Sequence, residues 1–201
     1  METTKLQAEV RAERGKGPAR RLRASGKLPA VFYGPGITPT PLTVDPAELE
    51  RHLRGVYGRN TLFELSYGDA SELAMVRDLV VEPVSRRLVH VDFLRVSLDR
   101  EVKAEVPLET KGRAIGVVKG GLLNITRRTV PVVCKPNLIP PAIVVDVSGI
   151  DLHETVTVGQ LDLPEGVRVT LPPELTLAII LEDKRAARLA EEKAKAEAAG
   201  A

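Results

Sequence analysis

The segment LVHVDFLRV, at residues 88–96, alternates apolar and polar side chains in the way that a half-buried strand does. Successive side chains of a strand point to opposite faces, so one face carries Val89, Val91 and Phe93. The opposite face carries His90 and Asp92, and it would lie in solvent if the sheet closes into a barrel. The segment therefore predicts a strand with a buried apolar face and an exposed polar face.

Strand patterns also precede this segment, separated by the glycine, proline, asparagine and aspartate residues that are typical of turns. They cover residues 4–10, 28–33, 41–44, 61–67 and 73–81. Two short helices interrupt them. The first covers residues 18–25, with a proline near its start and a glycine just past its end. The second begins at Asp45 and Pro46, a pair typical of a helix cap followed by the first helical position.

After residue 97, the sequence shows only strand and turn patterns up to residue 181. Strands are predicted at residues 101–110, 114–119, 122–134, 143–147, 155–158, 167–171 and 176–181. Short strands at this spacing favour a β-sandwich or a barrel. The remaining residues are rich in Ala, Glu, Lys and Arg and favour a helix by propensity, but almost no apolar stripe is available for packing. The predicted organisation is a first domain at 1–97, a second β domain at 98–181 and a charged tail at 182–201, helical or frayed.

The composition of the 201 residues is that of an ordinary globular protein, with 43% hydrophobic and 28% charged residues, and it excludes a wholly disordered or collagen-like chain. Only 3% are aromatic, so a core of Val, Leu, Ile and Ala is expected. The single cysteine, Cys134, excludes a disulfide framework within the chain and a zinc site built from cysteines, and it is expected to be buried. No apolar run approaches the ~20 residues needed to span a membrane, and no secretory signal is visible. These features predict a soluble cytoplasmic protein without a membrane partner.

Positive charge is concentrated near the N-terminus. The whole chain has a net charge of only +2, from 29 Lys and Arg residues against 27 Asp and Glu, which by itself argues against a nucleic-acid partner. Residues 11–27, here called the basic window, nevertheless hold seven cations and one anion: Arg11, Arg14, Lys16, Arg20, Arg21, Arg23 and Lys27, with Glu13. Arginine predominates, and its planar group donates two parallel hydrogen bonds to phosphates or base edges. The basic window therefore favours a nucleic-acid contact, with a solvated helix face as the alternative.

Three further side chains are candidates for contact with a nucleic acid. Tyr33 lies at the end of a predicted strand, where it could stack on a base or donate to a phosphate, although packing at the rim of a core is the alternative. His90 can donate to phosphates or base edges, and Asp92 can accept from the amino groups of guanine or cytosine. Because a carboxylate repels phosphates, Asp92 favours base reading or the orientation of an arginine. An exposed polar pair without a partner is the alternative for these two residues.

The sequence offers no set of residues typical of catalysis or of metal binding. Its three histidines, His52, His90 and His153, lie far apart and lack the spacing of a zinc site. The glycine-rich stretch at 112–121 lacks the strand and helix context of a dinucleotide-binding fingerprint and is interpreted as turns. His90 and Asp92 resemble two members of a hydrolytic triad without an evident nucleophile. No catalytic residue, metal or cofactor is therefore expected, and the chain is not predicted to be an enzyme.

Two motifs in the first half resemble a known family. They are RGKGPARRLRASGKLPAVFYG at residues 14–34 and VRDLVVEPVSRRLVHVDFLRV at residues 76–96. Both resemble the bacterial large-subunit ribosomal protein family that binds 5S ribosomal RNA, the general stress protein Ctc group. The second half resembles the longer, two-domain members of this family in GVVKGGLLN, IPPAIVVDVSGIDL and LPEGV, at residues 116–124, 139–152 and 163–167. The likeness covers residues 4–181 and leaves out the tail, which is charge-balanced rather than long and acidic.

The resemblance implies a mainly β fold. It has an N-terminal six-stranded β-barrel with two or three short helices, a C-terminal all-β domain of sandwich or barrel type, and a helical or disordered tail. The resemblance also implies that the barrel binds loop E of 5S rRNA, a non-standard internal helix, largely from its minor-groove side. The contacts of the C-terminal domain are less uniform within the family.

The resemblance assigns RNA contacts to eight residues. Arg14, Arg23 and Tyr33 match family residues that contact or face the RNA. His90 and Asp92 match the histidine–aspartate pair on the binding strand. The other cations of the same loop and helix match less closely and are expected at the RNA backbone: Lys16, Arg20 and Arg21.

The predicted partners are 5S rRNA and the large ribosomal subunit, with neighbouring ribosomal proteins as candidates for contact with the second domain. The protein is expected in the cytoplasm, associated with the ribosome, and as a monomer away from it. One alternative is a stress-related protein–protein interaction module without specific RNA binding, since the second domain has a net charge of −1 and the tail is charged. Another is a hydrolase that uses His90 and Asp92.

Overall fold

The computed structural model describes residues 3–68 and 70–182, and the chain divides into two compact units. Unit 1 comprises Met1–Ala104 and Val133–Pro141, and unit 2 comprises Glu105–Val132 and Ala142–Ala201. The predicted tail lies outside the described residues, except for Glu182, which belongs to the last strand. The domain boundaries drawn from the sequence stay predictions.

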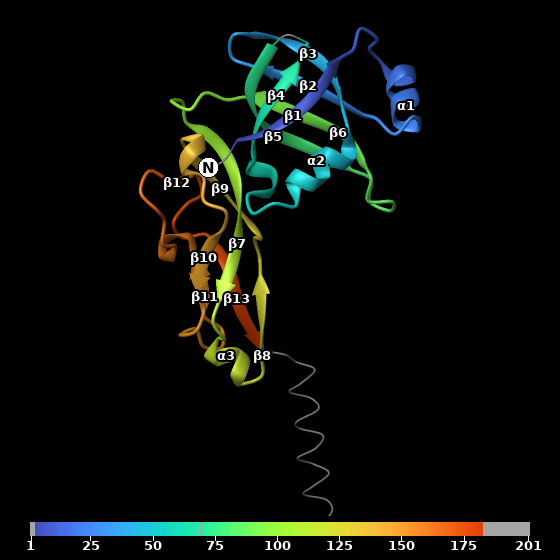
Figure 1. Cartoon of the computed structure of the whole chain (residues 1–201). Helices are drawn as coiled ribbons and strands as arrows, with labels where there is room; N and C mark the ends of the chain where they lie inside the picture. Colours follow the sequence, from blue (N-terminus) through green and yellow to red (C-terminus); the bar gives the residue numbers. More distant parts are fainter. Residues whose placement is uncertain (1–2, 69, 183–201) are drawn as a thin grey trace, which may run out of the picture. The chain divides into compact units, whose positions relative to one another are not determined.

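A closed barrel of six strands forms most of unit 1 (Figure 1). The strands are β1 (Thr3–Val10), β2 (Leu28–Gly34), β3 (Ile37–Val44), β4 (Leu62–Tyr67), β5 (Ala70–Val81) and β6 (Leu88–Arg95). Their order around the barrel is β1-β3-β2-β6-β5-β4. The β1–β4 and β2–β6 pairs are parallel, and the other neighbours are antiparallel. The expected six-stranded barrel is confirmed.

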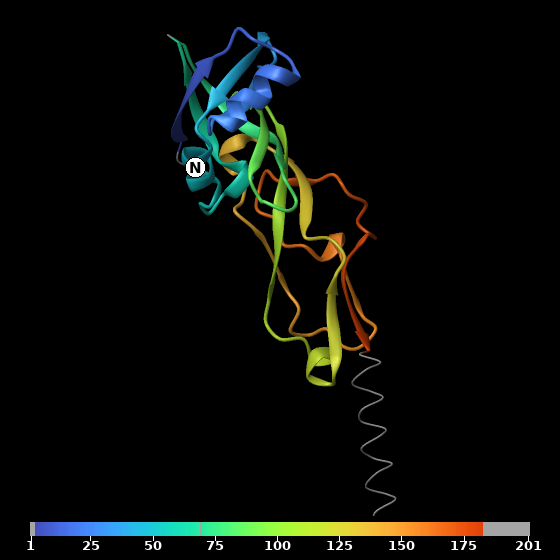
Figure 2. The same cartoon turned by 90° about the vertical axis from the view of Figure 1, so that its right-hand side faces the viewer.

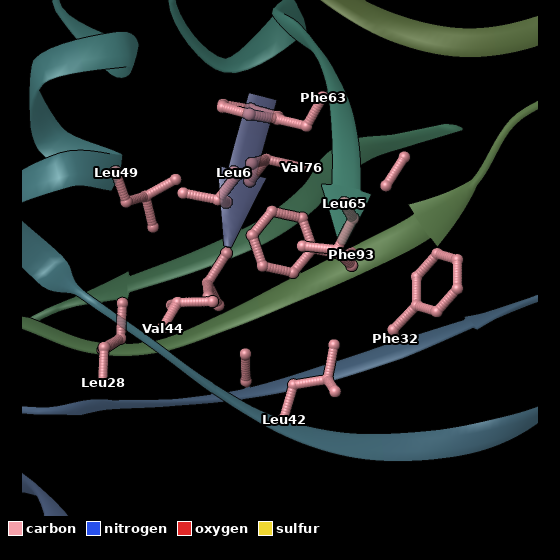
Figure 3. Close-up of a cluster of buried hydrophobic side chains, with 13 residues drawn as sticks. Leu6, Leu28, Phe32, Leu42, Val44, Leu49, Phe63, Leu65, Val76 and Phe93 are labelled. Atoms are coloured by element: carbon pink, nitrogen blue, oxygen red, sulfur yellow. The ribbon is translucent and has the colours of Figure 1, made fainter. Parts of the chain in front are cut away.

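The barrel interior holds aliphatic side chains packed around three phenylalanines (Figure 3). Phe32, Phe63 and Phe93 are completely buried, and the rings of Phe63 and Phe93 meet edge to face with their centroids 6.0 Å apart. The other core side chains are Leu6, Leu28, Ala30, Leu42, Val44, Leu49, Leu65, Ala74, Val76 and Val91. The prediction of a purely aliphatic core is wrong for this unit, because all three phenylalanines of the chain lie in it.

Helix α2 (Pro46–Leu53) begins as the sequence predicts. The Asp45 carboxylate accepts a 2.8 Å hydrogen bond from the backbone N–H of Ala47, which satisfies one of the free donors at the start of the helix. Leu49 is completely buried in the barrel core. The short 3-10 helix η1 (Gly58–Asn60) leads from α2 to β4.

Helix α1 (Lys16–Ala24) begins two residues before its predicted start and has no buried residue. Gly15 precedes it with a φ of 104°, in a region that favours glycine. Figures 1 and 2 show α1 on the outside of the barrel. Its exposure leaves most cations of the basic window at the surface.

Two further sheets follow the barrel in sequence. One has the order β10-β7-β9-β12, and the other has the order β11-β13-β8. The strands are β7 (Val102–Lys111), β8 (Gly121–Ile125), β9 (Thr129–Cys134), β10 (Ile143–Asp146), β11 (Thr155–Thr157), β12 (Arg168–Val169) and β13 (Thr176–Glu182), with 3-10 helices η2 (Pro136–Leu138) and η3 (Val158–Gln160) between them. Cys134 is completely buried, as predicted, and burial raises the pKa of its thiol. The mainly β class of this half is confirmed.

Two predicted strands of the second half are wrong. The strand expected at 122–134 is divided into β8 and β9, which belong to different sheets. Residues 114–119 contain a single helical turn, α3 (Ile115–Val118), instead of a strand. Gly116 in this turn is buried, and a Cβ there would come within 2.8 Å of the backbone nitrogen of Leu152 and 2.9 Å of Ile180 Cγ2. The turn is thus fixed by close packing against a distant segment, which local periodicity does not reveal.

Candidate nucleic-acid interface

The outer face of β6 presents the predicted histidine–aspartate pair. His90 Nδ1 lies 2.7 Å from Asp92 Oδ1, and the two side chains are 29% and 31% exposed. Val91 and Phe93, which alternate with them, are completely buried in the barrel core. The strand therefore has the two faces that its sequence predicts, and its polar face is accessible.

Val89 departs from this alternation, because it is only partly buried. Its neighbours on β6 pair with consecutive residues of β5: Leu88 with Val81, and His90 with Val80. Val89 is therefore the unmatched residue of a β-bulge, a feature that bends a strand and turns its side chains. The bulge lies directly before His90.

Tyr33 lies on β2, the parallel neighbour of β6. Val31 pairs with Asp92 and Tyr33 pairs with Leu94, so Tyr33 is on the same outer side of the sheet as Asp92. Partial burial raises the pKa of the Tyr33 hydroxyl, and the carboxylate of Asp92 raises it further. The phenol thus keeps its proton at neutral pH and can act as a hydrogen-bond donor beside the histidine–aspartate pair.

Two residues of β5 also belong to this face, and the sequence patterns did not single them out. Asp78 pairs with Asp92 across the β5–β6 ladder, and Arg77 is the unmatched residue of a second bulge beside it. Both residues act electrostatically on Tyr33: the Asp78 carboxylate raises its pKa and the Arg77 guanidinium lowers it. The sequence pattern could not place Arg77 and Asp78 on this face, because the extra residue of a bulge interrupts the alternation from which the faces of a strand are assigned.

The five cations of the basic window that were predicted to contact RNA fall into two groups. Arg21 Nη2 lies 2.9 Å from Glu13 Oε2 at the surface, and Arg23 Nη1 donates a 3.3 Å hydrogen bond to the backbone carbonyl of Val89. The other three, which are exposed, have no ion pair or side-chain hydrogen bond with any residue that the structure describes: Arg14, Lys16 and Arg20. These three retain their full hydrogen-bonding capacity for a ligand.

The bond from Arg23 joins the basic helix to the strand face. A cavity of about 660 Å³ lies between α1 and the β5–β6 hairpin, and its cationic lining is Arg23, Lys27 and Arg87. Glu50 and Glu82 line it as well. Since Arg23 is bonded to the residue that precedes His90, helix cations and strand pair border one continuous surface. We call this surface the strand–helix face; it comprises Tyr33, His90 and Asp92 with the α1 cations.

The described part of the chain shows neither a metal site nor a membrane-spanning helix. No group of three or more His, Cys, Asp or Glu side chains among residues 3–68 and 70–182 is arranged to hold a metal ion. Within the same residues, no helix is both long enough and apolar enough to cross a membrane.

The two halves of the chain match two family models. Residues 6–93 match the ribosomal L25p family, and residues 101–184 match the C-terminal domain of ribosomal protein TL5. The chain belongs to the ribosomal L25p family. Membership makes it a structural ribosomal protein and not an enzyme, so the hydrolase alternative for His90 and Asp92 is wrong.

Several relatives of this L25p-family protein bear the name large ribosomal subunit protein bL25. The protein from Anaeromyxobacter sp. (strain K) is 42% identical over 175 residues, which cover 87% of this chain and 73% of the relative. The protein from Sorangium cellulosum is 39% identical over 202 residues, covering 100% of this chain and 87% of the relative. The protein from Geobacter sulfurreducens is 38% identical over 182 residues, which cover 90% of this chain and 94% of the relative. The likeness thus extends over both halves.

Proposed function

We propose that this L25p-family protein, as a component of the large ribosomal subunit, binds loop E of 5S rRNA through its strand–helix face. The observation that carries the proposal is the exposed His90–Asp92 pair beside Tyr33, bordered by the cations of α1. The names of its relatives support the large subunit as the assembly. The family resemblance of the two barrel motifs supports 5S rRNA as the ligand.

In this proposal the cations supply affinity for the RNA backbone and fix the position of the protein along it. Arg14, Lys16 and Arg20 project from the loop and helix without partners among the described residues, so phosphates can occupy their donors without breaking existing bonds. Arg23 uses one of its five N–H donors on Val89. That bond orients its guanidinium, and the remaining donors are available for the RNA.

The strand residues supply discrimination. An RNA double helix displays 2′-hydroxyls and base edges in its wide minor groove. The Asp92 carboxylate accepts hydrogen bonds from amino groups or hydroxyls, the Tyr33 hydroxyl donates one, and His90 holds Asp92 in position through its 2.7 Å contact. A carboxylate next to phosphates is unfavourable, so its place at the centre of the face suits contact with bases or ribose better than with the backbone.

This mode of action makes and breaks no covalent bond. The protein acts by ordering loop E and docking it in the subunit, with unit 1 as the RNA-binding part. We assign contacts with neighbouring ribosomal proteins to the second half of the chain, and the protein alone is predicted to be a monomer.

The test is equilibrium binding of the full chain to 5S rRNA and to a 5S rRNA whose loop E is replaced by a regular duplex. We expect the replacement to weaken binding at moderate salt by about 10-fold or more, the loss of roughly one good base contact. Footprinting on 5S rRNA should protect loop E. Equal affinity for the two RNAs would show that the chain binds charge alone, and the proposal would be abandoned.

A further inference from the structure

A second basic concavity lies within unit 1, apart from the cavity beside α1. It has a volume of about 650 Å³ and lies where β6 ends and the chain leads into β7. Its charged lining is Arg77, Arg95, Arg100, Glu101 and Lys103. Pro35 and Gly36 of the turn after β2, together with Ser97 and the apolar residues at the end of β6 and the start of β7, form the rest of its wall. We call it the β6–β7 groove.

Arg95 forms the fixed wall of this groove. Its Nε and Nη2 atoms donate to the two carboxylate oxygens of Glu72 at 3.0 and 3.1 Å, and its Nη1 donates to the backbone carbonyl of Pro35 at 3.2 Å. The two-pronged pair neutralises most of its charge. Arg95 therefore shapes the groove and is not its ligand-binding cation.

Arg100 and Lys103 supply most of the remaining positive charge, against one carboxylate, Glu101, in the same lining. Both are exposed, and neither side chain forms an ion pair or a hydrogen bond with another residue in the described part of the chain. Arg77 joins them, because its Nη1 donates a 3.3 Å hydrogen bond to the backbone carbonyl of Lys103 and its other donors stay available. Three cations thus converge on one concavity, a combination suited to a phosphate-bearing ligand.

Arg77 also connects the groove to the strand–helix face. It is the extra residue of the β5 bulge, next to Asp78, which pairs with Asp92. Its charge acts on Tyr33, so it lies within electrostatic reach of that phenol. A polyanion that lies across Tyr33 and Asp92 would meet the groove by following the end of β6. This continuity favours RNA over an acidic protein segment as the occupant.

We propose that the β6–β7 groove binds the phosphate backbone of the RNA held on the strand–helix face, with Arg100 and Lys103 as its phosphate-binding side chains. The proposal rests on the proposed function. It extends the proposed RNA contact to Arg100 and Lys103, which lie outside the basic window. The ligand is recognised by its phosphates alone, so this contact adds affinity and register without sequence discrimination.

The test compares the full chain with the variant Arg100→Ala/Lys103→Ala in binding to 5S rRNA over a range of salt concentrations. Each phosphate contact contributes about 0.9 to the slope of log affinity against log salt for duplex nucleic acid. We therefore expect the variant to lower the slope by about 1.8, while its preference for intact loop E over a regular duplex is unchanged. The matched control is Arg51→Ala/Arg59→Ala, which removes the same charge from exposed positions outside the groove.

The outcomes separate this proposal from the proposed function. A slope reduced only as much as in the control overturns the groove proposal, and wild-type preference for loop E would then leave the proposed function standing. If the variant binds 5S rRNA normally but no longer joins the large subunit, the groove binds a protein partner and the proposal is wrong. If the wild-type chain shows no preference for loop E, the proposed function itself fails.

Discussion

The Nη1 atom of Arg23, on helix α1, donates a 3.3 Å hydrogen bond to the backbone carbonyl of Val89, on strand β6. Val89 is the unmatched residue of the bulge that precedes His90. A side chain of the exposed helix is thus tied to the strand that carries the histidine–aspartate pair. One arginine thus connects α1 with the residue that directly precedes the histidine–aspartate pair.

Arg23→Ala should weaken binding to 5S rRNA by about 10-fold and lower the slope of log affinity against log salt by about 1. The variant loses one cation directed at a phosphate and the hydrogen bond to Val89 that orients it. Arg23→Lys should restore the charge but only part of the affinity, since an ammonium group cannot bond Val89 and a phosphate with fixed geometry. The measurement is a salt titration of binding. Folding stability should change by less than about 0.5 kcal/mol, because the side chain is exposed; a large loss of stability would contradict a binding role.

Asp92→Asn should reduce the preference for loop E over a regular duplex by about 1–3 kcal/mol, because an amide cannot replace a carboxylate that accepts at both oxygens. The salt slope should stay the same, since no phosphate contact is removed. The measurement is the ratio of the two dissociation constants at several salt concentrations. A general gain in affinity for both RNAs would instead show that Asp92 only repels phosphate.

Tyr33 gives the strand face a dependence on high pH. Burial raises the pKa of its hydroxyl above the ordinary value of 10.0, as do Asp92 and Asp78, while Arg77 opposes them. The folded state therefore holds the phenol proton more tightly than the unfolded state, so stability declines as the pH rises from about 10 through the folded pKa. Urea unfolding between pH 9 and 11 should show a weaker decline in Tyr33→Phe than in the matched variant Tyr57→Phe. Equal declines would contradict the assignment.

Phe93→Ala should destabilise unit 1 by about 3–5 kcal/mol, because it leaves a cavity in the fully packed centre of the barrel. Val84→Ala is the matched surface control, since Val84 is 94% exposed, and it should change stability by less than about 0.5 kcal/mol. The measurement is the urea midpoint of each variant. Similar midpoints for the two variants would be inconsistent with a barrel core centred on the phenylalanines.

Gly116→Ala should destabilise unit 2 by about 1–3 kcal/mol, because the added methyl group would lie 2.8 Å from the backbone of Leu152 and 2.9 Å from that of Asp151. Gly149→Ala provides the control, since no atom lies within 4 Å of its Cβ position and its φ is not in the positive region. Thermal unfolding of the two variants measures the difference. Equal transition temperatures would show that α3 is not packed as described.

The sequence predicted the features that are determined by residues close together in the chain. The alternation around Val91 and Phe93 identified both faces of β6, and Asp45 with Pro46 identified the start of α2. The exposure of His90 and Asp92 followed from the same alternation. These features depend on residues within a few positions of one another, whereas Tyr33 joins the same face only through the pairing of β2 with β6.

Features that depend on long-range packing escaped prediction. The β5 bulge, which brings Arg77 and Asp78 to the strand face, is defined by its register with β6 and not by its own pattern. The helical turn at Gly116 is fixed by contact with Leu152, 36 positions later in the chain. The β6–β7 groove likewise requires the turn after β2 and the start of β7 to meet around Arg95, which no local pattern specifies.

The parallel pairing of β1 with β4, from Thr3 opposite Leu62 to Ala8 opposite Tyr67, has a consequence for synthesis of the chain. β1 can pair with β3 once both are synthesised, but its second neighbour, β4, is made later, and β6 must still be inserted between β2 and β5 before the ring is complete. A nascent chain that still lacks β6 therefore contains the residues of the basic helix but has unpaired edges on β2 and β5. The surface that we propose to bind RNA is therefore complete only when the last barrel strand, which carries His90 and Asp92, closes the ring.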